Sequence, residues 1–307
     1  MAVLVTGGMG FIGLHTARRL LDAGSRVVLT RYRAWRAPDF LAGEIGRDHL
    51  AVEQLDLADG WALSDVVRRY GVHSLVHLAG PALGTPPAAE YSVALTALVN
   101  VLEAARQHGL ERVSIASSIS VYAGAGPGPW REDQPLPVAS ASHIGAVKKA
   151  VESLGLDFAA STGVDVRILR LAGIYGPLYH SMANLPSRLC HAAVAGRPPD
   201  LRDARRATDL CYVKDAAAGI QQLHLAERLQ YPIYNVGAGR ATTDAELQAA
   251  VEHAVPGARF ELSSAEEATP DAYMDISRAR HDAGYQPAFD LGAAVKDYVA
   301  WLRGHPE

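Results

Sequence analysis

The sequence predicts an α/β fold, in which a doubly wound parallel sheet carries a smaller, discontinuous C-terminal lobe. Short β-branched runs alternate with longer amphipathic segments through the first 171 residues. The amphipathic segments have apolar residues at helical spacing, and several end at glycine. Such alternation is typical of parallel strands joined by helices that cover both faces of the sheet.

The expected elements follow in chain order. Strands are expected at residues 2–6, 26–30, 49–55, 74–79, 112–118 and 164–171. Helices are expected at residues 11–24, 63–71, 92–109 and 143–163. Each expected helix separates two expected strands, as parallel connections require.

The pattern loosens after residue 171, where prolines and a basic stretch interrupt it. Residues 211–223 and 231–237 then return to the core pattern, and a helical, polar tail begins near residue 237. We therefore expect a nucleotide-binding core from residues 1–171 and 209–236. Residues 172–208 and 237–307 would form the substrate-binding lobe.

Composition argues against several classes of protein. The chain has 307 residues, 49% hydrophobic and 20% charged, with a net charge of −4. This balance gives no electrostatic reason to expect nucleic acid or an anionic membrane as a partner. No apolar run approaches a membrane span, and the two cysteines, Cys190 and Cys211, have neither disulfide-framework nor metal-site spacing. We expect a cytoplasmic protein without a metal.

A glycine-rich turn follows the first expected strand. In VLVTGGMGFIG, Gly7, Gly10 and Gly13 stand between strand and helix, with Phe11 and Ile12 inside the same loop. Glycines here let the backbone approach a pyrophosphate, and the free N–H groups of the helix N-terminus attract its charge. The position of this turn in the first strand–turn–helix unit favours a dinucleotide over a tight turn alone.

Several motifs together resemble one enzyme family. TGGMGFIG is similar to the TGxxGFxG signature of extended short-chain dehydrogenases/reductases, the NAD-dependent epimerase/dehydratase family. The segments HLAG (77–80), SSISVY (117–122), RLAGIYGP (170–177) and YNVGAG (234–239) agree with it, so the similarity covers nearly the whole chain. The resemblance implies a Rossmann core, a C-terminal substrate lobe and a homodimer joined through helices near 90–107 and 143–160.

The end of the second strand bears on the choice of cofactor. An acidic residue there would favour NAD, but this chain has Arg31, followed by Arg33. Cations suit a 2′-phosphate, although a solvated basic loop fits the same residues. We favour NADP(H), with NAD as the alternative. By the resemblance, further cofactor contacts fall on Asp56 and Leu57 beside the adenine, and on Leu78, Ala79 and Gly80 beside the nicotinamide ribose.

The catalytic residues of the family are a serine or threonine, a tyrosine and a lysine. By resemblance, Ser118 in SSISVY is the serine, and Lys148 in IGAVKKAVE is the lysine, which also binds the nicotinamide ribose. The tyrosine transfers a proton, and the lysine lowers the pKa of its phenol. The tyrosine position, four residues before Lys148, is Ile144, which has no proton to give.

Three interpretations of Ile144 stay open. In the first, another group replaces the phenol. His143 at the helix N-terminus is the leading candidate, although a solvent-facing role suits it equally, and further candidates are Tyr122, Tyr175 and Tyr179. In the second, the cofactor is kept and the substrate needs no such proton transfer. In the third, the fold serves a non-redox lyase or cyclase, or a regulator, because fold does not fix function.

The expected substrate lobe departs from the nucleotide-sugar pattern of the family. Ile119 and Ser120 replace the acidic residues that follow the serine in 4,6-dehydratases, and Thr208 replaces a diphosphate-binding arginine. Gly173 stands where the family has an asparagine. The nearby Arg202, Arg205 and Arg206 fit either a solvated loop or another anion site. We therefore predict an enzyme with an atypical active site that oxidises, reduces or epimerises a polar small molecule in a biosynthetic pathway.

Overall fold

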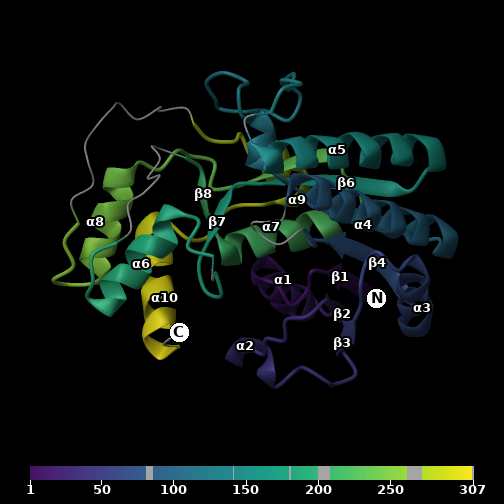
Figure 1. The fold of residues 1–307 in the computed structure, drawn as a ribbon, viewed down its shortest axis with the longest axis horizontal. Coiled ribbons are helices and arrows are strands. Elements are labelled where there is room, and N and C mark those ends of the chain that lie inside the picture. The colour runs from purple at the N-terminus through teal and green to yellow at the C-terminus, as the bar shows by residue number, and fades with distance from the viewer. Residues whose placement is uncertain (81–85, 141, 180, 200–207, 261–271, 306–307) are drawn as a thin grey trace.

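The structure is a computed structural model that describes residues 1–80, 86–140, 142–179, 181–199, 208–260 and 272–305. The predictions for Arg202, Arg205 and Arg206 therefore lie outside the described residues. Figure 1 shows a sheet flanked by helices, with three further helices, α6, α8 and α10, gathered at one end of the molecule.

A parallel sheet of seven strands forms the centre of the described chain, in the order β3-β2-β1-β4-β5-β6-β9. Its strands are β1 (Ala2–Thr6), β2 (Arg26–Arg31), β3 (Leu50–Gln54), β4 (Val72–His77), β5 (Arg112–Ser118), β6 (Asp165–Leu171) and β9 (Ile233–Val236). Every pairing within it is parallel. The strand order reverses between β1 and β4, and ligands of such sheets bind at the carboxyl edge near this point.

Helices cover both faces of this sheet. The helices of the described chain are α1 (Phe11–Asp22), α2 (Asp39–Ala42), α3 (Gly60–Tyr70), α4 (Pro87–His108), α5 (His143–Thr162), α6 (Leu185–Ala195), α7 (Val213–Leu225), α8 (Asp244–Ala254), α9 (Ser277–Ala283) and α10 (Leu291–Gly304), with a short 3-10 helix, η1 (Ile119–Tyr122). Of these, α6, α8 and α10 pack on one another at one end and not on the sheet. The predicted fold class is confirmed, and the six strands expected in the first half are all present, with ends that differ by at most two residues.

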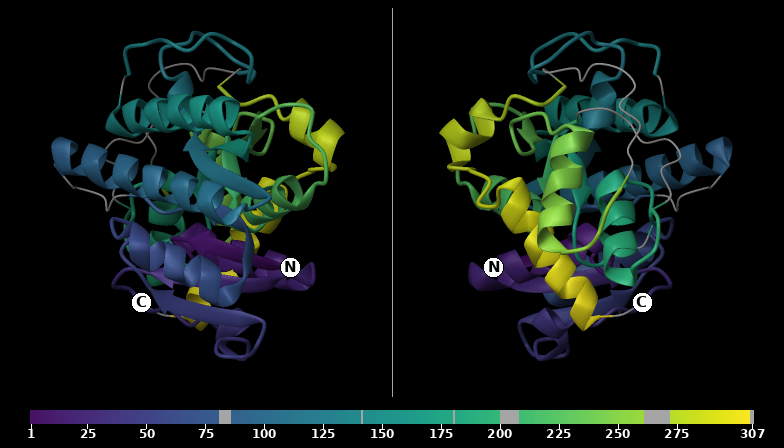
Figure 2. Two further views of the ribbon diagram at one scale, coloured as in Figure 1. Left: turned by 90° about the vertical axis from the view of Figure 1, so that its right-hand side faces the viewer. Right: turned by 90° about the vertical axis from the view of Figure 1, so that its left-hand side faces the viewer.

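Successive side chains of each strand point to opposite faces of the sheet, and this alternation divides the core into two layers. Val3 and Val5 of β1 pack with α1 and α7 on one face, while Leu4 packs with α3, α4 and α5 on the other. Each face therefore buries every second residue, which explains the nearly continuous apolar runs of the sequence. Figure 1 and Figure 2 show α4 and α5 lying side by side along one of these faces.

A third apolar cluster joins α6, α8 and α10. Leu189, Val251 and Val295 are among its buried residues. The described residues after 237 are mainly helical, as expected. They are not polar throughout, because α8 and α10 each bury an apolar side in this cluster. A second sheet pairs β7 (Gly173–Tyr175), in the expected lobe, with β8 (Leu210–Tyr212), in the expected core. The two expected parts are thus connected by strand pairing.

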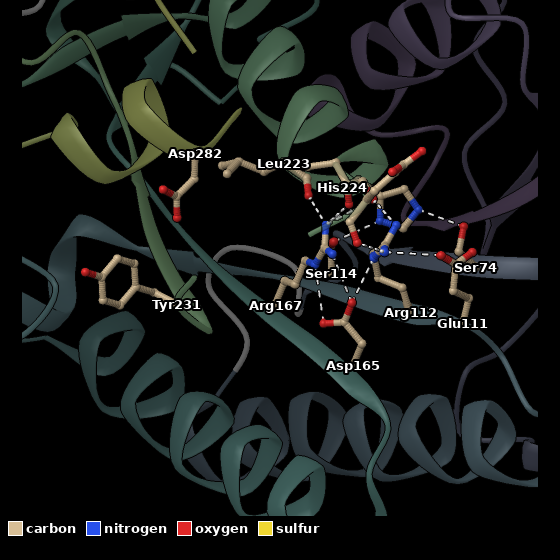
Figure 3. Close-up of polar contacts among 12 residues, drawn as sticks. Ser74, Glu111, Arg112, Ser114, Asp165, Arg167, Leu223, His224, Tyr231 and Asp282 are labelled. Carbon is tan, nitrogen blue, oxygen red and sulfur yellow. Dashed lines mark hydrogen bonds and ion pairs between the residues drawn. The ribbon is translucent and has the colours of Figure 1, made fainter. Parts of the chain in front are cut away.

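A buried polar cluster fixes the amino-terminal edge of the sheet, opposite the edge where the ligand is expected. His224, in the last turn of α7, is hydrogen-bonded to Ser74 of β4 and to Ser114 of β5, each at 2.8 Å. Arg112 and Arg167 donate to backbone carbonyls at the end of α7, including those of His224 and Leu223 (Figure 3). These cations satisfy carbonyls that the helix leaves without partners. The cluster therefore holds α7 against the sheet.

Among the described residues, the helices are all too short or too polar to cross a membrane. The same residues contain no group of three or more histidine, cysteine, aspartate or glutamate side chains arranged to hold a metal ion. Both cysteines are buried and unpaired.

Candidate active site

The glycine loop brings β1, β4 and α1 into close contact. Gly7 has φ of +68°, and a Cβ atom there would lie 2.8 Å from the backbone of Ala79 after β4. Only glycine fits this conformation and this approach without strain. The α1 N-cap is Gly10, and no acidic residue lies in the first turn. Phe11, Ile12 and Gly13 open the helix, so the loop offers backbone N–H groups to an anion.

Two further strand ends lie around this loop. The backbone N–H of Gly7 donates to Thr30 Oγ1 at 3.2 Å, and that of Met9 donates to the Thr30 carbonyl at 3.3 Å. The end of β2, where Arg31 follows, is therefore tied directly to the glycine loop. Leu78 is held by its N–H, which donates to the Thr6 carbonyl at 3.1 Å.

The remaining residues expected near the cofactor lie after β3 and β4. The carboxylate of Asp56 accepts from the N–H of Ala58 at 2.9 Å and so shapes the turn before α3. Asn100 of α4 donates to the Leu57 carbonyl at 2.8 Å. Gly80 is the last described residue before the gap at 81–85. Since Asp56, Leu57 and Gly80 each follow a strand, they lie toward the same carboxyl edge as the glycine loop.

The helix that carries Lys148 packs against the end of β5. Lys148 Nζ donates to the carbonyl of Ala116, two residues before Ser118, at 2.6 Å. A Cβ atom on Gly145 would lie 2.7 Å from the Ser120 carbonyl, so the glycine lets the first turn of α5 approach η1 closely. Ser142 caps the helix by accepting from the N–H of Gly145 at 3.1 Å. These contacts bring Lys148 and Ser118 to one region.

Burial shapes the electrostatics of this region. Desolvation lowers the pKa of Lys148 to about 8, although the carboxylate of Glu152 one turn on acts in the opposite direction. Lys148 is therefore mainly protonated at neutral pH. Desolvation, with the positive charge of Lys148, also lowers the pKa of His77 to about 3. This neutral imidazole bonds Thr6 Oγ1 through Nδ1 at 2.7 Å, so His77 is a structural link between β1 and β4.

Ile144 lies on the surface, with 44% of its area exposed. Its neighbour His143 is also exposed, and its Nδ1 lies 3.3 Å from the hydroxyl of Tyr91 in α4. Ser118 accepts from the N–H of Ser120 and donates to its hydroxyl, both at 3.1 Å. Tyr91 was not anticipated from the sequence, because nothing local shows that α4 and α5 begin side by side.

The alternative tyrosines differ in access. Tyr122 is buried, donates to Asn235 Oδ1 at 2.8 Å, and burial raises its pKa to about 12. Tyr175 is buried in the third cluster, where burial raises its pKa. Both residues are thus almost inaccessible to solvent, although Tyr175 lines a pocket together with Tyr212 and Asp215. Tyr179 is half-buried and packs edge-on against Phe11 of the glycine loop, with ring centroids 5.1 Å apart.

A buried ion pair fixes the position of α5, the helix that carries Lys148. Arg170 Nη2 of β6 donates to Glu152 Oε2 at 2.7 Å, and both side chains are almost fully buried. Ser117 also donates to Glu152, while Arg170 Nη1 donates to the hydroxyl of Tyr122 at 2.8 Å. The network therefore holds α5, β5 and β6 together one helical turn after Lys148.

Removing one partner of this pair is expected to destabilise the fold strongly. Glu152→Ala leaves the Arg170 guanidinium buried without its counter-ion, and such losses cost about 3–5 kcal/mol. Glu103, which is only partly buried and pairs with Arg106 at 2.6 Å on α4, provides the control. Its replacement by alanine should cost at most about 1 kcal/mol. Urea denaturation of both variants measures the difference, and equal losses would refute the role given to the buried pair.

Thr208, at the position expected for a diphosphate-binding arginine, forms an isolated antiparallel bridge with Thr242. The adjacent Asp209 is buried and accepts from the backbone N–H groups of Ala238 and Met274 at 2.7 and 3.1 Å. Desolvation raises the pKa of Asp209 to about 6, against the effect of these hydrogen bonds. Asp209 thus fastens the loop after β9 to β8.

Comparisons with known proteins agree with this geometry. The profile of the NAD dependent epimerase/dehydratase family matches residues 3–237. A dTDP-glucose 4,6-dehydratase of Streptomyces griseus is 29% identical over 316 residues, covering 99% of this chain and 94% of that protein. UDP-glucose 4-epimerase 2 of Arabidopsis thaliana is 27% identical over 339 residues, covering 99% of this chain and 96% of that protein.

A solved structure shows the same arrangement along the whole chain. The UDP-glucose 4-epimerase of Thermus thermophilus, in complex with NAD, is 26% identical and superposes with a TM-score of 0.81. The alignment covers 99% of this chain and 100% of that one. The predicted class, a nicotinamide-dependent oxidoreductase or epimerase, is therefore confirmed at the level of the family. With its parallel sheet, glycine loop and matching profile, the chain belongs to the NAD dependent epimerase/dehydratase family.

Proposed function

We propose that this protein binds NADP(H) and oxidises, reduces or epimerises a polar, carbohydrate-like small molecule. The hydrogen bond from Lys148 to Ala116 carries the proposal, because it brings the helix of Lys148 to the end of β5, where Ser118 lies. The curated relatives named above act on dTDP-glucose and UDP-glucose, which favours a hydroxylated substrate of this kind.

In this proposal, the glycine loop around Gly7, Gly10 and Gly13 holds the pyrophosphate, and Lys148 binds the nicotinamide ribose. The dinucleotide would supply hydride transfer. With substrate bound, the Ser118 hydroxyl would turn from Ser120 and donate its one hydrogen bond to the reacting oxygen, so that it stabilises the developing negative charge. The charge of Lys148 acts in the same sense, because Lys148 is mainly protonated below about pH 8.

Proton transfer at the substrate oxygen is the step for which the usual phenol is missing. Ile144 occupies the tyrosine position of the resemblance, so His143 is the group we propose for this transfer. Its Nδ1 lies beside the hydroxyl of Tyr91, which leaves Nε2 as the nitrogen that would exchange a proton with the substrate. A non-redox or regulatory protein that keeps the dinucleotide is the alternative, and Ile144 is the observation that favours it.

The proposal also gives the two parts of the chain separate roles. Residues 1–171 and 209–236 bind the dinucleotide, and residues 172–208 and 237–307 bind the substrate. We also propose a homodimer through α4 and α5, since Val93, Val99 and Leu154 on these adjacent helices are exposed apolar residues. Apolar side chains on two neighbouring helices are typical of a protein interface.

Cofactor titration and turnover test the proposal together. The purified protein should bind NADPH about tenfold or more tightly than NADH, as expected for charge-assisted bonds from arginine to a 2′-phosphate. With a panel of carbonyl compounds, it should also consume NADPH, seen as a loss of nicotinamide absorbance. Tight NADPH binding without any turnover would favour the non-redox alternative, and equal binding of NADH would refute the preference for NADP(H).

A further inference from the structure

Arg31 is held in a defined position at the end of β2. It pairs in register with Gln54 at the end of β3, and its own carbonyl accepts from the N–H of Leu55 at 2.9 Å. Its Nη2 donates to Gln54 Oε1 at 2.8 Å. The guanidinium is therefore attached to the neighbouring strand, although it lies toward solvent.

An indole ring provides a second contact for the same guanidinium. The Arg31 Cζ atom lies 5.8 Å from the centroid of the Trp35 ring, within the range of a cation–π interaction. Trp35 is 55% exposed, so burial in the core does not explain its position. Arg33 is arranged differently, because its guanidinium lies 4.9 Å from the ring of its own neighbour, Tyr32.

The hydrogen-bond partner of Arg31 is a neutral amide. An arginine has five N–H donors, and the bond to Gln54 occupies one of them. The amide leaves the positive charge in place, whereas a glutamate of the same shape would neutralise it. A guanidinium ordered beforehand also loses less conformational entropy when it binds a phosphate.

The location of Arg31 matches one part of a dinucleotide. Thr30, immediately before it, accepts hydrogen bonds from Gly7 and Met9 of the glycine loop. A dinucleotide whose pyrophosphate lies on that loop places its adenosine ribose over the end of the second strand. Arg31 therefore lies where a 2′-substituent of this ribose would project.

We propose that Gln54 and Trp35 are positioning residues that hold Arg31 for the 2′-phosphate of NADP(H). This inference rests on the proposed function and deepens its cofactor specificity. Gln54 holds the guanidinium by a neutral hydrogen bond, and Trp35 holds it by the cation–π interaction. Selectivity for the phosphorylated ribose thus depends on three residues drawn from β2, β3 and the segment between β2 and α2.

Calorimetric titration with adenosine 2′,5′-bisphosphate and 5′-AMP tests this without any catalytic step. The wild type should bind the bisphosphate at least about tenfold more tightly than 5′-AMP, and Arg31→Met should abolish the preference. Gln54→Met and Trp35→Ala should each weaken bisphosphate binding about three- to tenfold while 5′-AMP binding stays unchanged. Trp35→Phe should keep most of the preference, and Gln54→Glu should remove it.

Arg68→Met is the matched control, since Arg68 pairs with Asp65 on the exposed side of α3 and its loss lowers the net charge equally. It should leave both affinities unchanged. A wild type that binds both probes equally would overturn the proposed preference for NADP(H). A preference that requires Arg31 but is insensitive to Gln54 and Trp35 would overturn this inference alone.

Discussion

In a His143→Ala background, where the proposed proton carrier is removed, the further change Ile144→Tyr is expected to raise the rate of NADPH consumption with a carbonyl substrate about 10²–10⁴-fold, the contribution of a positioned general acid or base. Residue 144 lies one helical turn before Lys148, so both side chains project from the same side of α5. Because Ile144 is 44% exposed, a larger ring fits without disturbing the core. The positive charge of Lys148 would lower the pKa of the new phenol and make it a better proton carrier.

Ile144→Phe is the control for this experiment, because it adds the ring without the hydroxyl. The rate should rise with tyrosine only, and the absorbance of the nicotinamide measures it. Equal rates for the two variants would show that proton transfer at residue 144 does not limit the reaction. His143→Ala then separates the interpretations, since it should lower the wild-type rate if His143 carries the proton and leave cofactor affinity unchanged.

Acidification from pH 7 to pH 5 is expected to destabilise the fold by about 4 kcal/mol. Burial lowers the pKa of His15 to about 4, and that of His77 and His224 to about 3. The ordinary pKa of histidine is 6.5. At pH 5 the unfolded chain therefore binds protons on these three side chains, whereas the folded chain does not. Between pH 7 and pH 5, each histidine therefore costs about 1.8 kcal/mol of stability.

The buried carboxyl of Asp209 acts in the opposite direction. Its pKa is raised to about 6 from 3.8, so the folded state binds this proton more tightly, and stability is gained as the pH falls through 6. That gain is about 1.3 kcal/mol between pH 7 and pH 5 and offsets part of the loss from the three histidines.

Urea denaturation at pH 7, 6 and 5 measures the net effect of these groups. His281→Gln, at an exposed position on α9, should leave the pH dependence unchanged. A free energy of unfolding that stays constant between pH 7 and pH 5 would contradict the assignment of neutral buried histidines.

Much of the candidate site could be predicted from local patterns. The glycine loop, Ser118 and Lys148 follow from motifs because each is tied to the end of a strand or the start of a helix, and parallel strands bring these ends to one edge. Tyr91 and Gln54 could not be predicted in this way. Tyr91 meets His143 only because α4 packs beside α5, and Gln54 meets Arg31 only through the register of β3 on β2.

The pKa values of the buried groups could not be predicted from the sequence either. His77 and His224 look like any other histidine in the chain, and their lowered pKa values come from burial between strands and helices that are distant in sequence. Likewise, nothing in the sequence near residue 152 shows that Glu152 pairs with Arg170.

The sequence by itself determined the α/β fold and the glycine-rich turn, and it predicted a dinucleotide on that turn and Ile144 at the tyrosine position, because these depend on residue type and short-range spacing. Only the tertiary structure decided which tyrosines are buried, which side chains contact Arg31 and which side chain lies beside His143. These properties depend on packing and desolvation, which arise when distant segments come together.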